Sequence, residues 1–148
     1  MRSPELRLLD ASECGLDEEG LRAAAREQGA SALHASRSYR FPYAVIACHQ
    51  LPVGVDIERI EQHDKAFVES ICTPAERQHL SQIDDWGRFA SSLWCSKEAL
   101  SKALGDALQY DPRRLESPIW WSDGKAGAWR ARELELVTDH VVWLCWRR

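Results

Sequence analysis

Apolar and polar residues alternate most regularly in residues 51–60, where every second position of the central part is apolar: Val53, Val55 and Ile57. Asp56 and Glu58 therefore fall on the opposite face of a predicted strand. Their α-carbons would lie roughly 6.5–7 Å apart, which is two strand rises. Carboxylates at that spacing can converge on a small, hard cation such as Mg²⁺. Taken alone, however, the pair is more typical of solvated acids on an exposed strand face.

A pattern with the period of an α-helix extends over residues 88–104. At about 100° per residue, its larger apolar side chains fall within a stripe about 60° wide: Phe89, Leu93, Leu100 and Leu104. Glu98 and Lys102 project from the opposite side, and Gly105 is typical of the end of a helix. Lys97 lies at the border of the stripe, where a long stem can pack while its ammonium reaches a polar site. Taken alone, Glu98 and Lys102 are typical of an ion pair on an exposed helix.

The strand and the helix together change the interpretation of each. They offer three carboxylates, from Asp56, Glu58 and Glu98, and two ammonium groups, from Lys97 and Lys102. This set indicates a divalent-metal site with cationic neighbours, which is suited to binding a phosphate ester.

The remaining pattern predicts further short elements on either side of these two. Helices are expected at residues 18–28, 65–71 and 74–83, the last with Thr73 as N-cap and Pro74 in the first turn. Strands are expected at residues 43–48, 119–121, 128–135 and 140–146. The predicted fold class is α+β: an antiparallel sheet packed against a long α-helix, as a single domain over residues 1–148.

Composition narrows the class of protein. A chain of 148 residues with 45% apolar residues is expected to be one globular domain, without a membrane span or a signal peptide. A net charge of −4 argues against a nucleic-acid-binding module. Basic pairs such as Arg37 and Arg40 are interpreted mainly as solvated, although some are able to meet phosphates or an acidic protein partner. Five cysteines without metal-like spacing indicate a reducing cytoplasm and no disulfides.

The two motifs resemble those of the 4′-phosphopantetheinyl transferases. The residues that carry the resemblance are Gly54-Val55-Asp56-Ile57-Glu58 and Trp94-Cys95-Ser96-Lys97-Glu98-Ala99-Leu100-Ser101-Lys102. The resemblance is closest to the surfactin-synthetase-activating branch, and Phe67, residues 73–77 and Arg88 are also similar to that branch. It covers residues 31–148, with residues 1–30 as a shortened N-terminal segment, and it implies the same α+β architecture.

The resemblance implies transfer of the 4′-phosphopantetheine arm of coenzyme A to a serine of an apo acyl or peptidyl carrier protein, with 3′,5′-ADP as the second product. Asp56, Glu58 and Glu98 would hold Mg²⁺, with Mn²⁺ as an alternative. Asp56, Glu98 and Lys102 are the expected catalytic residues, and Lys97 and Lys102 are expected to bind phosphate oxygens. Glu98, or a metal-bound water that it orients, would take the serine proton.

The sequence departs from the family pattern in two ways. Ser36-Arg37-Ser38 stands where the family has a Ser-His-Ser-like element, so Arg37 and Ser38 are expected to bind a coenzyme A phosphate, with a surface arginine as the alternative. The chain is also shorter than the surfactin-type relatives, whose two similar halves enclose coenzyme A. We therefore expect a homo-oligomer, as in the small holo-acyl-carrier-protein synthases, although Glu58 is a carboxylate that those synthases often lack.

The implied transfer would serve a carrier protein of fatty acid, polyketide or peptide biosynthesis. Two other functions are alternatives to it. One is a non-catalytic module that binds coenzyme A or a carrier protein through the same cleft. The other is a Mg²⁺-dependent phosphohydrolase, which needs a water-activating histidine or aspartate cluster that the sequence does not offer. Trp94 shares the helix face of Glu98, so it either walls the pocket or fills a packing role.

Overall fold

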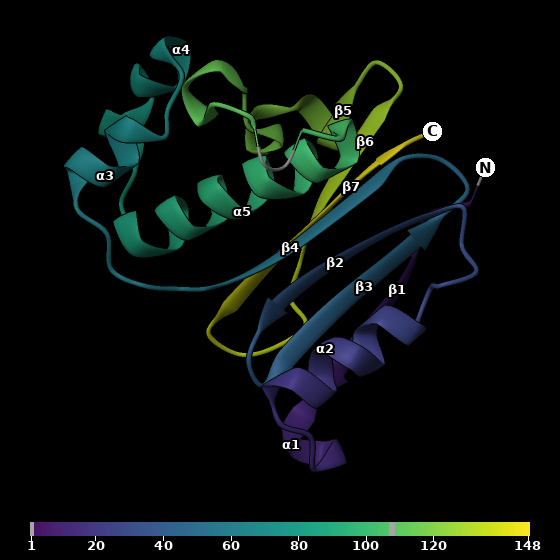
Figure 1. The fold of residues 1–148 in the computed structure, drawn as a ribbon. Coiled ribbons are helices and arrows are strands. Elements are labelled where there is room, and N and C mark those ends of the chain that lie inside the picture. The colour runs from purple at the N-terminus through teal and green to yellow at the C-terminus, as the bar shows by residue number, and fades with distance from the viewer. Residues whose placement is uncertain (1, 107–108) are drawn as a thin grey trace.

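The computed structural model describes residues 2–106 and 109–148, which form two antiparallel sheets lying side by side (Figure 1). The first sheet has the strand order β1-β3-β2, and α1 and α2 pack against it through Ala11, Leu21 and Ala25. Its elements, all within the first fifty residues, are β1 (Glu5–Asp10), α1 (Ala11–Cys14), α2 (Glu18–Glu27), β2 (His34–Arg40) and β3 (Tyr43–His49).

The second sheet has the order β4-β7-β6-β5, and the long helix α5 (Trp86–Leu104) lies across it. Its strands are β4 (Val53–Arg59), β5 (Lys125–Ala126), β6 (Trp129–Leu134) and β7 (His140–Arg147). Around α5 lie the helices α3 (Lys65–Ser70) and α4 (Pro74–Arg77) and the 3₁₀ turns η1 (Leu80–Gln82), η2 (Pro112–Arg114), η3 (Pro118–Trp120) and η4 (Ser122–Gly124). The expected α+β class, with antiparallel strands packed on a long helix, is confirmed.

Strand β4 has the alternation that its sequence predicts. Val53, Val55 and Ile57 lie in a core shared with β3 and β7, and the other face of β4 is turned toward α5. Helix α5 approaches this face very closely at Gly54, where an added β-carbon would overlap the carbonyl oxygen of Ala99 and lie 2.6 Å from the amide nitrogen of Ala103. Glycine at this position therefore allows the two main site-bearing elements to touch.

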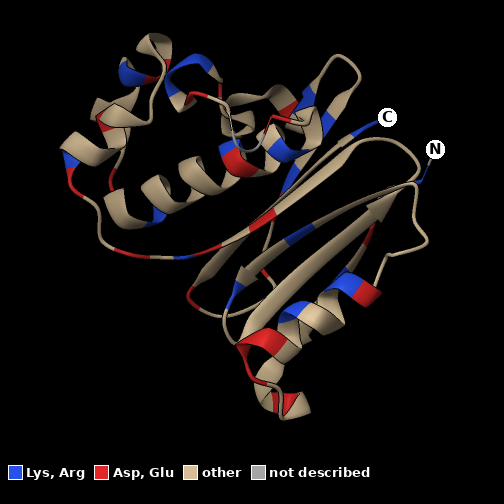
Figure 2. Cartoon of the chain, in the orientation of Figure 1, with Lys and Arg blue, Asp and Glu red and all other residues tan. Residues whose placement is uncertain are grey.

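The two sheets meet along β2 and β4, which run in the same direction. Ser36 Oγ accepts a hydrogen bond from the backbone N–H of Val55 at 3.0 Å, and Ser38 Oγ accepts one from that of Ile57 at 3.1 Å. Serine side chains thus satisfy the outer edge of β4 in place of a backbone ladder. Charged residues of both signs gather where α5 approaches this seam (Figure 2).

Several expectations about the elements need correction. Residues 119–121 are wrong as a strand, because Ser117 caps the 3₁₀ turn η3 there. The helix expected at residues 74–83 is α4 followed by η1, although the predicted Thr73 cap and Pro74 first turn are confirmed. Strands β1 and β2 were not predicted, and Leu104 is exposed rather than buried on the helix stripe. Across the described residues, no helix has the length and apolar character needed to cross a membrane.

Candidate functional site

A pocket of about 340 Å³ opens at the seam between β2, β4 and α5. It brings together the three predicted carboxylates, Asp56 and Glu58 from β4 and Glu98 from α5, although the two segments are some forty residues apart in the chain. The other side chains around it are Arg22, Arg37, Ser38, Tyr39, Arg40, Trp94 and Lys102. Residues before position 50 therefore form one wall of this pocket, opposite α5.

Asp56 lies at the buried base of the pocket, with 4% of its surface exposed. Its Oδ1 accepts hydrogen bonds from Ser38 Oγ at 2.9 Å and from Lys102 Nζ at 3.1 Å. Its Oδ2 is buried and has no hydrogen-bond partner among the described residues. A buried carboxylate oxygen without a donor is costly. The unpartnered Oδ2 therefore fits a ligand that the protein itself does not supply, such as a cation.

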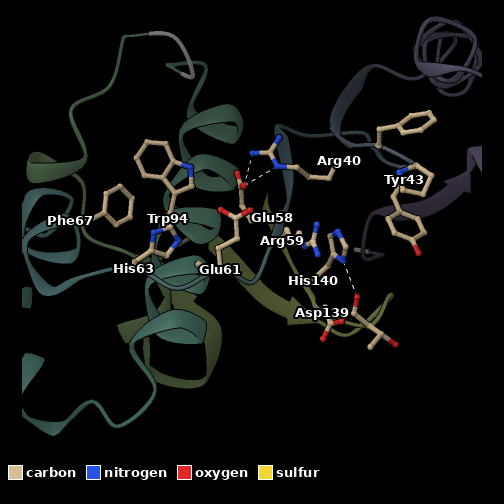
Figure 3. A pocket seen from close by; sticks show the side chains of 14 residues that line it. Arg40, Tyr43, Glu58, Arg59, Glu61, His63, Phe67, Trp94, Asp139 and His140 are labelled. Carbon is tan, nitrogen blue, oxygen red and sulfur yellow. Dashed lines mark hydrogen bonds and ion pairs between the residues drawn. The ribbon is translucent and has the colours of Figure 1, made fainter.

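Glu58 is paired with an arginine that the sequence analysis did not include among the site residues. Nε of Arg40 donates to Oε2 of Glu58 at 3.0 Å, and a second guanidinium nitrogen also donates to Oε2 (Figure 3). Burial, and then the neighbouring Asp56 carboxylate, raise the pKa of Glu58 to about 8, against the opposing effect of Arg40. The protein thus holds Glu58 in a place where its negative charge is costly, and Arg40 compensates part of that cost.

Glu98 is held by a tyrosine that the sequence analysis also missed. Tyr110 Oη donates to Glu98 Oε1 at 2.7 Å, and the ring of Tyr110 lies 6.5 Å from that of Trp94, centroid to centroid. Burial raises the pKa of Glu98 despite this hydrogen bond. Burial also raises the pKa of Tyr110, so that its hydroxyl remains a donor at neutral pH. No local motif marks Tyr110, because it reaches Glu98 from the segment that follows α5.

Lys102 reaches the pocket as predicted, and its ammonium joins three parts of the seam. It donates to the backbone oxygen of Arg37 on β2 at 3.2 Å, to that of Val55 on β4 at 2.9 Å, and to Asp56 Oδ1 at 3.1 Å. Its side chain remains 23% exposed. Lys102 therefore places positive charge beside Asp56 at the base of the pocket.

Lys97 does not reach the pocket. Its side chain is fully buried on another side of α5, where Nζ donates to Glu76 Oε1 at 2.6 Å, to the Ile71 oxygen at 2.6 Å and to the Pro112 oxygen at 2.7 Å. Three acceptors satisfy the three donors of an ammonium group. The long stem does reach a polar site from the border of the helix stripe, but that site is an internal carboxylate rather than a phosphate site.

Arg37 also differs from its expected place. It lies within strand β2 rather than in a loop, and its guanidinium donates to the backbone oxygens of Ala25, Arg26 and Gln28 at the end of α2, at 2.8, 3.2 and 2.9 Å. Ser38, by contrast, faces Asp56. Because side chains alternate along a strand, Ser38 and Arg40 share the face toward β4, and Arg37 has the opposite one. An expectation of strand structure at residues 34–40 would have selected Arg40 instead of Arg37.

A second, larger pocket of about 770 Å³ adjoins the first and shares Arg40, Glu58 and Trp94 with it (Figure 3). His63, Phe67 and Trp94 lie toward one end, and Tyr43 and His140 toward the other. Trp94 therefore walls both pockets, and it also packs against the core cluster around Val68 and Leu93, so both roles left open for it are found. The charged centre at Glu58 and Arg40 lies between these aromatic ends.

The carboxylates of Asp56, Glu58 and Glu98 line one pocket, but they do not converge on one point as the ligands of a bound metal ion do. Within residues 2–106 and 109–148, no three His, Cys, Asp or Glu side chains lie closely enough together to hold a metal ion. Glu58 is turned to Arg40 and Glu98 to Tyr110, while Asp56 presents a free oxygen. An oxygen-only donor set with one unpartnered buried carboxylate oxygen is the chemistry that suits Mg²⁺. The residue types thus fit this cation, provided that Glu58 and Glu98 change partners.

Comparison with known proteins identifies the family of this chain. The family model for the 4′-phosphopantetheinyl transferase superfamily matches residues 52–144, which include β4, all of α5 and most of β7. The chain is also similar to a holo-[acyl-carrier-protein] synthase from Vibrio parahaemolyticus serotype O3:K6 (strain RIMD 2210633), with 35% identity over 65 residues. That match covers 39% of this chain and 52% of the relative, so the chain spans about half the length of the curated relative that it matches.

The antiparallel sheets packed on the long helix α5 fit the fold of this family. The chain belongs to the 4′-phosphopantetheinyl transferase superfamily.

Proposed function

We propose that this protein transfers the 4′-phosphopantetheine arm of coenzyme A to a serine of an apo carrier protein. The observation that carries the proposal is the pocket at the seam, where Asp56, Glu58, Glu98 and Lys102 meet in a chain of this superfamily. The unpartnered Oδ2 of Asp56 supports a cation requirement. The products would be the holo carrier protein and 3′,5′-ADP.

Asp56, Glu58 and Glu98 would hold Mg²⁺, with Mn²⁺ as a possible substitute. The bound cation would supply positive charge beside the diphosphate of coenzyme A, where transfer of a phosphoryl-linked group concentrates negative charge.

The protein's own residues would position the reactants and move one proton. Lys102 supplies fixed positive charge beside Asp56, which favours binding of a diphosphate. Glu98, or a metal-bound water that it orients, is the proposed acceptor of the serine proton, because its carboxylate lines the pocket together with Asp56. The hydrogen bond from Tyr110 limits the rotation of the Glu98 carboxylate.

The predicted roles of three further residues differ in their support. Ser38 lines the pocket and holds Asp56 in place, so we propose that it acts through that carboxylate. Arg37 and Lys97 have their donors engaged by backbone oxygens and by Glu76. We therefore propose that these two residues support the framework of the site, without direct contact with phosphate.

Intact-mass spectrometry of an apo carrier protein, incubated with this protein, coenzyme A and Mg²⁺, tests the function directly. We expect a mass gain of roughly 340 Da, which corresponds to one phosphoryl-linked arm. Asp56→Asn and Glu98→Gln should abolish the gain, whereas Glu13→Gln, an exposed change in α1, should keep it. No gain with fatty acid, polyketide and peptide carrier proteins would contradict transfer.

Two other predictions belong with this experiment. Coenzyme A binding without transfer would favour the alternative of a non-catalytic binding module. The homo-oligomer expected from chain length remains a prediction, and a solution mass above that of one 16.9 kDa chain would support it. Light scattering with and without coenzyme A measures that mass.

A further inference from the structure

Arg40 occupies the junction of the two pockets that surround the candidate site. It ends strand β2, lines both pockets and lies directly against Glu58. Two of its nitrogens donate to Glu58 Oε2, and Nη1 donates to the backbone oxygen of Tyr39 at 2.8 Å. Its side chain is 45% exposed, against 13% for Glu58. The guanidinium can therefore leave Glu58 without disturbing the core.

The charge balance of the pocket explains why Arg40 is there. Asp56 and Glu58 are neighbouring carboxylates with largely buried side chains, and two such groups need positive charge nearby. Lys102 provides it for Asp56, and Arg40 provides it for Glu58. Arg40 thus supplies to Glu58 the charge compensation that a divalent cation would also supply.

The two other arginines that line the smaller pocket, Arg22 and Arg37, have other partners. Arg37 binds the end of α2, and the guanidinium of Arg22 lies over the ring of Tyr39, 4.3 Å from its centroid. Of these three, Arg40 is the one whose present partner is a carboxylate expected to change partners when a cation binds. Guanidinium forms paired hydrogen bonds with phosphate as readily as with carboxylate.

We propose that Arg40 exchanges Glu58 for a phosphate of coenzyme A when a divalent cation binds. This inference rests on the proposed function and adds to it a residue that couples the two ligands. Because Arg40 and the cation compete for Glu58, Arg40 weakens cation binding in the absence of coenzyme A. Because the released guanidinium then contacts phosphate, Arg40 strengthens coenzyme A binding in the presence of the cation.

Titration of Mn²⁺, followed by the electron paramagnetic resonance signal of the free ion, tests whether Arg40 and the cation compete for Glu58. Without coenzyme A, Arg40→Gln should bind Mn²⁺ about two- to five-fold more tightly than the wild type, in line with the small contribution of a half-exposed ion pair. Arg40→Lys keeps a positive charge for Glu58 and should remain near the wild type. Arg26→Gln, an exposed arginine of α2, is the matched control for the loss of one charge.

Calorimetric titration of coenzyme A at saturating Mn²⁺ tests whether the released Arg40 guanidinium contacts a phosphate. Arg40→Gln should weaken coenzyme A binding by about tenfold or more, since a hydrogen bond to a charged group is lost. The coenzyme A affinity of Arg40→Lys should lie between those of the wild type and Arg40→Gln, because lysine retains the charge but not the paired donors.

The competition for Glu58 and the contact with phosphate can be contradicted separately. Equal or weaker Mn²⁺ binding by Arg40→Gln, or no Mn²⁺ binding by either protein, overturns the competition. Unchanged coenzyme A affinity overturns the phosphate contact. In another outcome, Arg40→Gln binds Mn²⁺ more tightly and coenzyme A more weakly than the wild type, while the wild type transfers no arm to a carrier protein. That result would contradict the proposed function and support the exchange at Arg40.

Discussion

Glu58 is the residue whose environment departs most clearly from that of an ordinary acid in water. Burial and the Asp56 carboxylate raise its pKa from 4.5 to about 8. Between these pH values the folded protein binds more protons than the unfolded chain, so the free energy of unfolding falls as the pH rises from about 4.5 to about 8. At the residue scale, ionisation of Glu58 is therefore destabilising.

Glu58→Gln should remove this pH dependence. The free energy of unfolding of the variant should increase relative to that of the wild type as the pH rises through this window. The change is on the order of a few kcal/mol at most, since one pKa unit corresponds to about 1.4 kcal/mol. Urea unfolding at several pH values measures it, with the exposed Glu19→Gln in α2 as the control. A constant difference across the pH range would contradict the raised pKa.

Gly54 has a different role at the same scale, because it sets how closely α5 approaches β4. Gly54→Ala would drive a β-carbon into the backbone of Ala99 and Ala103, and backbone atoms cannot rotate away. We expect a loss of stability of about 1–3 kcal/mol, typical of an overfilled core, together with reduced transfer because Glu98 and Asp56 move apart. Gly20→Ala in α2 is a milder control, since its added carbon meets mainly side-chain atoms. Equal stability of the two variants in urea would show that the contact between β4 and α5 tolerates the added carbon.

At the scale of elements, the buried pair of Lys97 and Glu76 holds α5 to the segments around it. Glu76 Oε1 also accepts from the Thr73 N–H, and Oε2 accepts from the Ser117 N–H at 2.8 Å and from Trp120 Nε1 at 2.9 Å. Together with the bonds from Lys97 to Ile71 and Pro112, this network fastens the end of α3, helix α4 and the turns η2 and η3 to one point of α5. One lysine of the family motif thus orders the scaffold behind the site.

A double-mutant cycle measures this connection. Lys97→Met and Glu76→Gln should each destabilise the protein by about 3–5 kcal/mol, because each leaves a buried partner uncompensated. The double variant should lose much less than the sum. The exposed pair Lys65 and Glu69, 3.8 Å apart on α3, gives the control cycle with a coupling of about 0.5 kcal/mol or less. Additive losses in the buried pair would mean that its two members act independently.

At the scale of the whole molecule, the seam between the two sheets creates the site. Ser36 and Ser38 from the first sheet bind the backbone of β4, and Lys102 from α5 spans both sheets. Since the pocket lies on this seam, its geometry depends on contacts between parts of the chain that are distant in sequence.

Ser36→Ala and Ser38→Ala should each lower the free energy of unfolding by about 1–3 kcal/mol, because a buried backbone N–H loses its acceptor. Ser38→Ala should also weaken Mn²⁺ binding, since it releases Asp56, whereas Ser36→Ala should have a smaller effect on that affinity. Ser70→Ala, at an exposed position of α3, is expected to stay within about 0.5 kcal/mol of the wild type. Equal Mn²⁺ affinities for Ser36→Ala and Ser38→Ala would contradict the role of Ser38 at the carboxylate.

The sequence alone determined the elements that carry the acids. Period-two alternation separated Val53, Val55 and Ile57 from the face of β4 that bears Asp56, and helical spacing turned Glu98 and Lys102 together toward one side of α5. These are local properties, because the backbone geometry of a strand or a helix sets the side on which each residue lies.

Only the tertiary structure decided which donors the acids meet. Arg37 and Lys97 are close to the site in the sequence, yet they turn to the end of α2 and to Glu76, while Arg40 and Tyr110 reach Glu58 and Glu98. Long side chains choose partners according to the charges and free acceptors around them, and those neighbours come from distant segments. The sequence therefore determined the three carboxylates and Lys102, and folding determined that Arg40 binds Glu58 and Tyr110 binds Glu98.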